Sequence, residues 1–490
     1  MIYIVNKSKS ISYLEIFELC SAFLPEEKFH ESLDENVPNA IIIEEENGEF
    51  IATLKSADGS IVSCSERAID TGEALSKASL FRLTTKKSIY CLMHKITGKI
   101  LPWGVLTGMR PIKLVSSYIN KGILNEEVFN LLKNLYLISD EKAMQALNIA
   151  MTQSPFLESF KRNTYSLYLS IPFCPTRCSY CSFPSLSYNT YRDNIKEYVD
   201  KLLFELENIK ISLSNWNLSS IYIGGGTPTT LPKNEMVRIL NFIHKYFGSI
   251  SELTVEAGRP DTLDAEYLLL LKENGVNRIS INPQTMNDET LRQVGRNHTA
   301  RDIIDIFEKA RIAEIQSINM DLIAGLPGEG TKEMNHTLKV LRELDPDNLT
   351  VHTLSIKRGS NLKINAENLS ENSEDINSML SLAEKFAVGS GLKPYYLYRQ
   401  KHIMGNHENI GYSRPGMECI YNIAIMEEKQ TIIGIGMGAA SKFYNKYLDS
   451  HIRYANFKDF KNYMTRIDEQ IEHKSEYLLE IEKSWPSVLT

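Results

Sequence analysis

The sequence predicts an α/β protein built around a partial barrel of six parallel strands, each followed by a helix. From residue 165 onward, six short apolar runs alternate with amphipathic segments such as IKEYVDKLLFELENI and NEMVRILNFIHKYF. Each run ends in polar or glycine-rich residues, and a barrel of parallel strands builds its site from the segments that follow the strands. The 490-residue chain is long enough for two or three domains.

The six predicted strands are YSLYLSIP, SIYIGGG, LTVEAG, RISIN, SINMDLIAG and NLTVHTLS. They place the partial barrel within residues 161–360. Residues 1–160 are expected to form a separate α/β domain of unknown role, with a helix over ISYLEIFELCSAFL and strands over NAIIIEEE and EFIATLKSADGSIVSCS. Residues 361–490 are expected to form an α+β extension that covers the substrate.

Composition and charge restrict the class of function. The chain carries 54 Lys and Arg against 61 Asp and Glu, a net charge of -7, which argues against sequence-independent nucleic-acid binding. We therefore expect a small-molecule substrate. The first residues lack the pattern of a signal peptide, and no apolar run reaches the roughly 18 residues of a membrane span, so we expect a cytoplasmic protein.

The seven cysteines fall into two classes. Four stand singly among apolar residues and are expected to be buried free thiols in a reducing compartment: Cys20, Cys64, Cys91 and Cys419. The other three, Cys174, Cys178 and Cys181, lie in PFCPTRCSYCSF directly after the first barrel strand.

This triplet predicts an iron–sulfur cluster. A structural zinc site normally closes its tetrahedron with four protein ligands, and no second cysteine pair follows here. A 4Fe–4S cluster held by three thiolates leaves one iron for a ligand that is not protein. An incomplete zinc site and unrelated free thiols are the alternatives.

The spacing of the triplet resembles that of radical S-adenosylmethionine (SAM) enzymes, in which SAM chelates the free iron and is cleaved to a 5′-deoxyadenosyl radical. Tyr180 fills the place of the aromatic residue usual before the last cysteine. The resemblance implies a radical SAM barrel, a 4Fe–4S cluster on Cys174, Cys178 and Cys181, and SAM as second cofactor.

Polar groups at the ends of the later strands agree with a cofactor pocket. Gly224–Gly226 end the second strand and allow a ligand to approach the backbone closely. Glu256, Gln284, Arg296 and Asp321 lie at or near the ends of the third to fifth strands. Taken singly, any of them could be a buried, satisfied polar residue or a surface charge, and for Gln284 and Arg296 that explanation is the stronger one. Together, in register with the cysteines, the four favour a polar pocket.

Over roughly residues 165–450 the chain resembles the oxygen-independent coproporphyrinogen III oxidase group, in the motif order YLSIPFC, GGGTPT, VEA, GVNRISINPQ and DLIAGLPGE. Within that group it is most similar to the HemZ, or coproporphyrinogen dehydrogenase, subfamily. The resemblance implies conversion of coproporphyrinogen III to protoporphyrinogen IX by radical-driven oxidative decarboxylation, with an external one-electron reductant of the flavodoxin or ferredoxin type. It implies cofactor contacts from Tyr168, Gly225, Gly226, Thr227, Glu256, Gln284, Arg296, Asp321 and Ser355.

One departure keeps two other functions open. Ser182 and Phe183 follow Cys181, whereas the well-studied oxidase type has one residue and then a fourth cysteine there. The related haem-chaperone type also lacks that cysteine and has a phenylalanine in the place of Phe183. A haem-binding, chaperone-like protein and a radical SAM enzyme acting on haem are therefore the alternatives.

Residues that would contact a tetrapyrrole are less defined by the sequence. Candidates for binding carboxylates are Arg110, Lys113, Arg259 and Arg399, each equally a surface or structural residue. Candidates for axial ligands of haem are His298, His352, His402 and His407, although a lone histidine is more often structural. Tyr395, Tyr396 and Tyr398 are candidates for stacking, or for an ordinary aromatic core.

Overall fold

The computed structural model describes residues 1–69, 75–108, 110–355, 367–399 and 407–485. The chain divides into two compact units, Met1–Met151 and Thr152–Thr490. Among the described residues, no helix is both long and apolar enough to cross a membrane.

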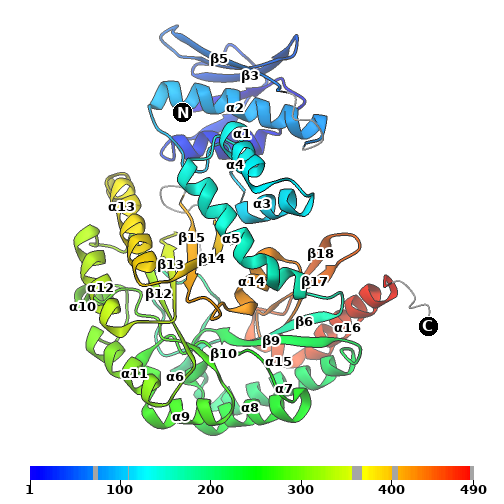
Figure 1. Ribbon diagram of the computed structural model, residues 1–490, viewed down its shortest axis with the longest axis vertical. Helices are drawn as coiled ribbons and strands as arrows, with labels where there is room; N and C mark the ends of the chain where they lie inside the picture. Colours follow the sequence, from blue (N-terminus) through cyan, green and yellow to red (C-terminus); the bar gives the residue numbers. More distant parts are fainter. Residues whose placement is uncertain (70–74, 109, 356–366, 400–406, 486–490) are drawn as a thin grey trace. The chain divides into compact units, whose positions relative to one another are not determined.

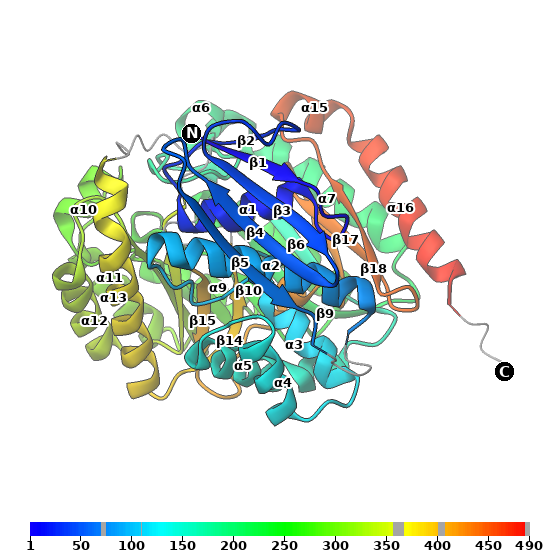
Figure 2. The ribbon, with the colours of Figure 1, turned by 90° about the horizontal axis from the view of Figure 1, so that it is seen from above.

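The first unit is an α/β unit with a five-stranded sheet in the order β2-β1-β3-β4-β5. The strands are β1 (Ile2–Asn6), β2 (Phe29–Glu31), β3 (Ala40–Glu46), β4 (Glu49–Lys55) and β5 (Ile61–Arg67). Two helices, α1 (Tyr13–Phe23) and α2 (Lys77–Thr97), pack on one face of this sheet (Figure 2). The helix and strands predicted here are confirmed; α1 begins at a capping box of Ser12 and Glu15. The helices α3 (Pro111–Asn120), α4 (Asn125–Asn134) and α5 (Asp140–Ser159) follow.

The second unit contains all six predicted strands, parallel and adjacent in chain order. They are β6 (Thr164–Ile171), β9 (Asn217–Gly225), β10 (Leu253–Val255), β11 (Arg278–Ser280), β12 (Ser317–Ala324) and β13 (Asn348–Thr353). Figure 1 shows helices along the outer face of this curved sheet: α7 (Ile195–Ile211), α8 (Lys233–Phe247), α9 (Ala265–Glu273), α11 (Ala300–Ile312) and α12 (Thr331–Leu344). The predicted partial (β/α)6 barrel is therefore confirmed.

Strands from residues 361–490 extend the barrel sheet on both sides. β16 (Thr431–Ile435) pairs in parallel with β6, and β17 (Ala440–Asn445) and β18 (Ser450–Ala455) continue antiparallel. On the other side, β15 (Asn409–Ser413) and β14 (Lys393–Tyr398) continue antiparallel from β13. This α+β extension shares one sheet and one compact unit with the barrel.

The remaining strands and α-helices lie between these elements or near the end of the chain. They are β7 (Phe173–Cys174), β8 (Leu186–Ser187), α6 (Tyr188–Tyr191), α10 (Asp288–Gln293), α13 (Glu367–Gly389), α14 (Ile420–Glu427), α15 (Phe460–Thr465) and α16 (Ile467–Lys483).

The outer helices form because their apolar residues recur with the helical period. In α8, Met236, Ile239, Leu240 and Ile243 are buried against the sheet at spacings of three and four residues. The same reasoning identified these segments as helices in the sequence.

A buried ion pair joins α16 to the barrel. Lys474 pairs with Glu205 of α7, and both side chains are completely buried. Glu205 also accepts hydrogen bonds from the Gly436 N–H at 2.8 Å and from the Tyr463 hydroxyl at 2.7 Å. Burial lowers the pKa of Lys474, although Glu205 opposes that shift. A carboxylate this deep needs its donors and its cation, because transfer from water costs several kcal/mol per ion.

Removing the cation should destabilise the second unit strongly. Lys474→Met leaves the charge of Glu205 buried without a counter-ion, so we expect the free energy of unfolding to fall by about 3–5 kcal/mol in urea denaturation. The control is Glu469→Gln, which removes an ion pair whose two side chains, Arg466 and Glu469, are each 48% exposed. That change should cost less than about 1 kcal/mol. Equally small effects of the two substitutions would contradict the role given to Lys474.

Candidate cofactor and substrate site

A cavity of about 440 Å³ opens at the carboxyl ends of the barrel strands and reaches into the barrel interior. All the residues predicted to contact the cluster or SAM line it: Tyr168, Cys174, Cys178, Cys181, Gly225, Gly226, Thr227, Glu256, Gln284, Arg296, Asp321 and Ser355. The structure thus brings together residues spread over more than 180 positions of sequence, from Tyr168 to Ser355. Their individual contacts with cofactors stay predictions.

The cavity exists because the strands turn alternate polar residues inward. The inward positions are Thr254 and Glu256 on and after β10, Arg278, Ser280 and Asn282 along β11, Asn319 and Asp321 on β12, and Asn348, Thr350 and His352 on β13. The intervening residues, such as Ile279 and Met320, are apolar and fully buried. A barrel with a packed interior carries branched apolar residues at the inward positions. The polar interior therefore indicates a ligand chamber.

The cysteine loop that follows β6 is fastened by hydrogen bonds from other strand ends. The Thr176 hydroxyl donates to the carbonyl of Gly295 at 3.0 Å, and Arg259 Nη1 donates to the Thr176 hydroxyl at 2.7 Å. Arg259 also donates to both carboxylate oxygens of Asp261, at 2.9 and 2.7 Å. Although Arg259 lines the cavity, its guanidinium is used to hold the loop, which disfavours its predicted role with substrate carboxylates.

The three thiols face the same cavity with different surroundings. The Thr227 hydroxyl donates to Cys174 Sγ at 3.6 Å, and Cys178 lies beside Tyr180 and Arg296. Burial raises the pKa of the Cys174 thiol to about 11 and also raises that of Cys181. Within the described part of the chain, no three His, Cys, Asp or Glu side chains converge closely enough to hold a single metal ion. Three thiols around one cavity are the ligand set of a 4Fe–4S cluster that leaves one iron open, whereas a structural zinc site normally takes four protein ligands.

The glycines at the end of β9 are required by their close approach to β6 and to the cysteine loop. A Cβ on Gly226 would lie 2.6 Å from the carbonyl oxygen of Phe173 and 3.0 Å from Cys174 Sγ. Gly225 has φ +113°, and a Cβ there would lie 3.0 Å from Ser170 Oγ. A side chain on Gly226 would displace the start of the cysteine loop, and one on Gly225 would be strained by its positive φ. The sequence suggested close approach of a ligand; the structure adds close approach of the protein's own backbone.

Glu256 and Asp321 give the chamber two carboxyl groups in different states. Burial and the neighbouring Asp321 raise the pKa of Glu256 to about 8. A hydrogen bond from the Gly225 N–H at 3.3 Å acts in the opposite direction but does not cancel the shift. Burial also opposes the ionisation of Asp321. The nearby His352 and the hydrogen bonds from the side chains of Asn319 and Thr350 outweigh this effect, so the pKa of Asp321 is lowered. At neutral pH the cavity wall thus holds one protonated and one ionised carboxyl group.

Gln284 has a side-chain oxygen without a hydrogen-bond partner among the described residues, whereas Arg296 joins two loops through hydrogen bonds. Gln284 has φ 67°, unusual for a residue with a side chain, and its backbone bridges to β12 through Asp321 and Ile323 at 2.8 and 3.0 Å. Its buried Oε1 has no hydrogen-bond partner within the described residues, as expected of a group awaiting a ligand. Arg296 donates to the carbonyls of Asn282, Pro283 and Gly258, and so ties two strand-end loops together.

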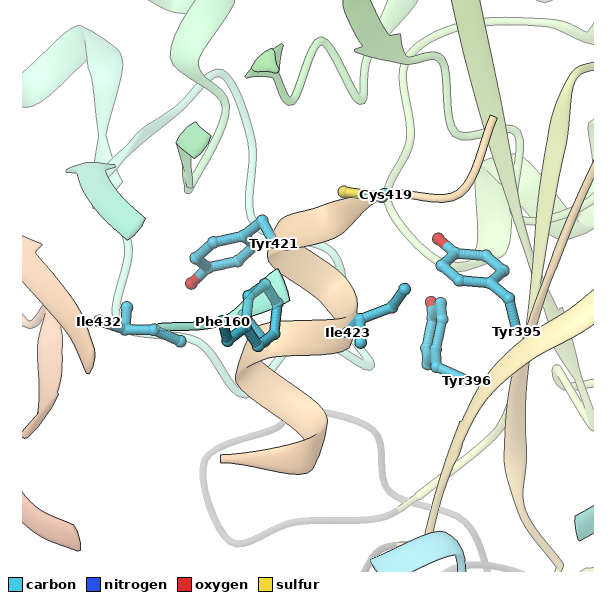
Figure 3. Close-up of a cluster of buried hydrophobic side chains, with 8 residues drawn as sticks. Phe160, Tyr395, Tyr396, Cys419, Tyr421, Ile423 and Ile432 are labelled. Carbon is cyan, nitrogen blue, oxygen red and sulfur yellow. The ribbon is translucent and has the colours of Figure 1, made fainter. Parts of the chain in front are cut away.

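Tyrosines form one wall of the chamber. Tyr168, Tyr222 and Tyr421 stack in a group, with ring centroids 4.6 Å apart for the closest pair, Tyr222 and Tyr421. Figure 3 shows Tyr421 on one side of α14, with Tyr395 and Tyr396 of β14 on the other. All five rings line the cavity. Sequence reasoning missed Tyr222 and Tyr421; for Tyr222, the inward alternation along SIYIGGG was the available signal.

Of the described histidines considered as haem ligands, His352 lines the cavity and the others do not. His352 lines the cavity; its Nδ1 lies 3.3 Å from the Tyr398 hydroxyl and its Nε2 lies 3.7 Å from Asp321 Oδ2. His298 is buried beside Asp261, with a pKa lowered by burial, and like His407 it is absent from the described cavity wall.

The remaining candidates for carboxylate binding lie elsewhere or outside the described part. Arg399 is buried away from the described cavity wall, and its burial lowers its pKa to about 10. Arg110 and Lys113 belong to the Met1–Met151 unit. His402 lies outside the described residues. Ser182 and Phe183 line the cavity, and Phe183 is 65% exposed.

Comparison with known proteins agrees with this geometry. Residues 168–341 match the model of the radical SAM superfamily. Over 398 residues, or 80% of this chain and 79% of the relative, the sequence is 42% identical to the oxygen-independent coproporphyrinogen-III oxidase-like protein HemZ of Bacillus subtilis. The heme chaperone HemW of the same organism is 31% identical over 56% of this chain and 70% of its own.

Among solved structures, coproporphyrinogen III oxidase (HemN) from Escherichia coli, a radical SAM enzyme, matches with a TM-score of 0.49 and 24% identity over 66% of this chain and 73% of that chain. With the cysteine triplet, the partial barrel and the extent of the HemZ match, the chain belongs to the radical SAM superfamily and, within it, to the oxygen-independent coproporphyrinogen III oxidase group.

Proposed function

We propose that this protein converts coproporphyrinogen III to protoporphyrinogen IX by oxygen-independent oxidative decarboxylation. The observation that carries the proposal is the single polar chamber in which every predicted cofactor residue meets beside a wall of tyrosines. Membership of the superfamily implies a 4Fe–4S cluster and SAM. The relative that matches over most of both chains bears the name of a coproporphyrinogen-III oxidase-like protein.

The residues divide the work as follows. Cys174, Cys178 and Cys181 would hold the cluster. SAM would occupy the chamber beside it, near these residues: Tyr168, Gly225, Gly226, Thr227, Glu256, Gln284, Arg296, Asp321 and Ser355. When bound and reduced by an external one-electron donor of the flavodoxin or ferredoxin type, the two cofactors supply a radical that removes a hydrogen atom from the substrate.

The protein's own contribution is binding and exclusion of water. A propionate side chain offers no acidic proton at the carbon that must react, so acid–base groups cannot begin the reaction. The tyrosine wall offers flat apolar faces for pyrrole rings, and the inward amides and hydroxyls offer donors for carboxylates. The region after residue 360 supplies Tyr395, Tyr396, Tyr398 and Tyr421 to this wall, which supports its proposed role in covering the substrate.

An anaerobic assay with matched variants tests the proposal. The reconstituted protein, given SAM, a reductant and coproporphyrinogen III, should form 5′-deoxyadenosine and decarboxylated vinyl porphyrins together, scored by mass spectrometry. Cys178→Ala should lose both products by more than about a thousandfold, because the cluster loses one of three ligands. Cys91→Ser, a cysteine of the first unit, is the control and should keep both.

Two outcomes would count against the proposal. SAM cleavage without vinyl products would retain the cofactor assignment and reject the substrate. Undiminished activity of Cys178→Ala would reject the cluster assignment itself.

Glu256 predicts a pH dependence of stability. Its pKa is about 8 in the folded protein and 4.5 ordinarily, so between these values the unfolded chain releases a proton that the folded chain retains. The stability of the cofactor-free protein should therefore be lowered by this group as the pH rises from about 5 to 8. The glutamine of Glu256→Gln does not titrate. In denaturant titrations across this window, the free energy of unfolding of the variant relative to the wild type should therefore rise by up to about 1.4 kcal/mol per pH unit. Parallel pH profiles would show that the carboxyl group is not held protonated.

His352 supports haem binding as a second candidate function. Among the three described candidate histidines, it alone lines the cavity, and its Nδ1 lies 3.3 Å from the Tyr398 hydroxyl. Binding of haem iron through Nε2 would replace the contact of that nitrogen with Asp321 Oδ2 at 3.7 Å. The relatives named heme chaperones make this reading worth testing.

Haem titration of His352→Ala separates the two functions. If coproporphyrinogen III is the substrate, ferric haem should give the same absorption spectrum with wild type and variant, and the variant should still cleave SAM. A six-coordinate haem spectrum that wild type shows and His352→Ala loses would favour the haem-binding function instead.

A further inference from the structure

Two cysteines outside the cofactor site lie in direct contact within the first unit. Cys64 is on β5 and Cys91 is on α2, 27 positions further along the chain, and their sulfur atoms are 2.8 Å apart. The sequence had suggested isolated thiols, because nothing in the spacing brings the two together. The packing of α2 against β5 makes them neighbours.

The alignment of strand and helix around this pair is fixed by other contacts. Cys64 pairs with Ala52 of β4 inside the sheet, so its backbone is held by the antiparallel ladder. One helical turn before Cys91, Lys87 forms an ion pair with Glu66 of β5 at 3.4 Å. Lys86 of the same helix pairs with Glu15 at 3.0 Å. The two sulfurs are thus presented to each other by a helix and a strand that are both anchored.

A separation of 2.8 Å is closer than sulfur atoms normally approach without a bond, and a disulfide bond is about 2.05 Å long. Closing the bond requires movement of less than about one ångström. Exposure also differs between the two: Cys64 is 9% exposed, whereas Cys91 is partly exposed at the surface of the unit. An oxidant therefore reaches Cys91 first.

We propose that Cys64 and Cys91 form a reversible dithiol–disulfide site that links β5 to α2. The oxidant is a low-molecular-weight disulfide of the glutathione type. The Cys91 thiolate attacks it, which forms a mixed disulfide and releases one small thiol. Cys64 then attacks Cys91 Sγ, forms the protein disulfide and releases the second small thiol. Two protein thiols are oxidised, one small disulfide is reduced, and the two protons pass to the departing thiolates.

Burial of Cys64 sets the order of these steps. Desolvation raises the pKa of its thiol to about 12, so it is a poor first nucleophile but is placed to resolve a mixed disulfide at its neighbour. The link would join the edge strand of the five-stranded sheet to the helix that covers it. It would close a loop of 27 positions, long enough for a disulfide to restrict the unfolded chain appreciably.

Peptide mapping of the full-length protein tests the proposal directly. The protein is incubated with oxidised glutathione, free thiols are alkylated, and non-reduced peptides are analysed by mass spectrometry. We expect one cross-linked peptide pair joining Cys64 to Cys91, lighter than the two separate thiol peptides by two hydrogen atoms, and its disappearance with dithiothreitol. Thermal unfolding of the oxidised protein should shift upward by about 5–10 °C for the transition of the first unit.

Variants and an internal standard make the result decisive. Cys64→Ser and Cys91→Ser should each abolish the cross-link, and Cys64→Ser should leave Cys91 carrying a stable glutathione adduct. Cys20, fully buried in α1, is the internal standard and should stay a free thiol throughout. Two results with the folded wild type would overturn the proposal. One is recovery of both Cys64 and Cys91 as free thiols, and the other is a glutathione adduct on Cys91 while Cys64 stays a free thiol. Because the readout is covalent mass in the first unit, it is independent of the activity assay.

Discussion

The close approach of three backbone segments beneath the cysteine loop is the constraint on which the candidate site depends. The end of β6 lies between the glycines after β9 and those after β16. A Cβ on Gly436 would lie 2.6 Å from the carbonyl oxygen of Ser170 and 2.8 Å from the Tyr198 hydroxyl, much as one on Gly226 would strike Phe173. The loop carrying Cys174, Cys178 and Cys181 therefore starts from a backbone that is confined on both sides.

Buried hydrogen bonds keep those segments together. The Tyr198 hydroxyl donates to the carbonyl of Ser170 at 2.6 Å and accepts from the Met437 N–H at 3.0 Å, while Ser170 Oγ donates to the Met437 carbonyl at 2.9 Å. Glu205 holds the adjoining Gly436 and is itself neutralised by Lys474 from the far end of the chain. The C-terminal helix thus contributes to the position of the cysteine loop without approaching the cavity, which explains why the extension and the barrel fold as one unit.

The sequence was a good guide wherever one short stretch carried the whole pattern. Six strands and the cysteine triplet were readable because periodicity and spacing are local properties. Only some of the polar inward positions were recognised from the sequence. Glu256 and Asp321 stood out as charged residues at strand ends, whereas Thr254, Asn319 and Thr350 were not singled out. Their common direction appears only when neighbouring strands are aligned in register.

Contacts between distant segments were beyond sequence reasoning. Tyr421 reaches the cavity from a helix more than 250 positions after Tyr168, and nothing in its neighbourhood distinguishes it from a core tyrosine. For Arg259 the sequence left a structural role and a role with substrate carboxylates equally open, because its partners Thr176 and Asp261 become evident only once two loops meet. The pair Cys64 and Cys91 was missed for the same reason, since a strand and a helix must pack before the two sulfurs come into contact.

Burial of the cysteine loop determines how readily its thiols ionise. Burial favours the neutral thiols of Cys174 and Cys181 and raises the pKa of each. A cluster binds thiolates, so loading must release protons, and part of the binding free energy is used for that release. Arg296 beside Cys178, and Arg259 on the far side of Thr176, supply positive charge that offsets this cost. The two arginines, Arg259 and Arg296, therefore favour the ionised form of thiols that burial alone would keep neutral.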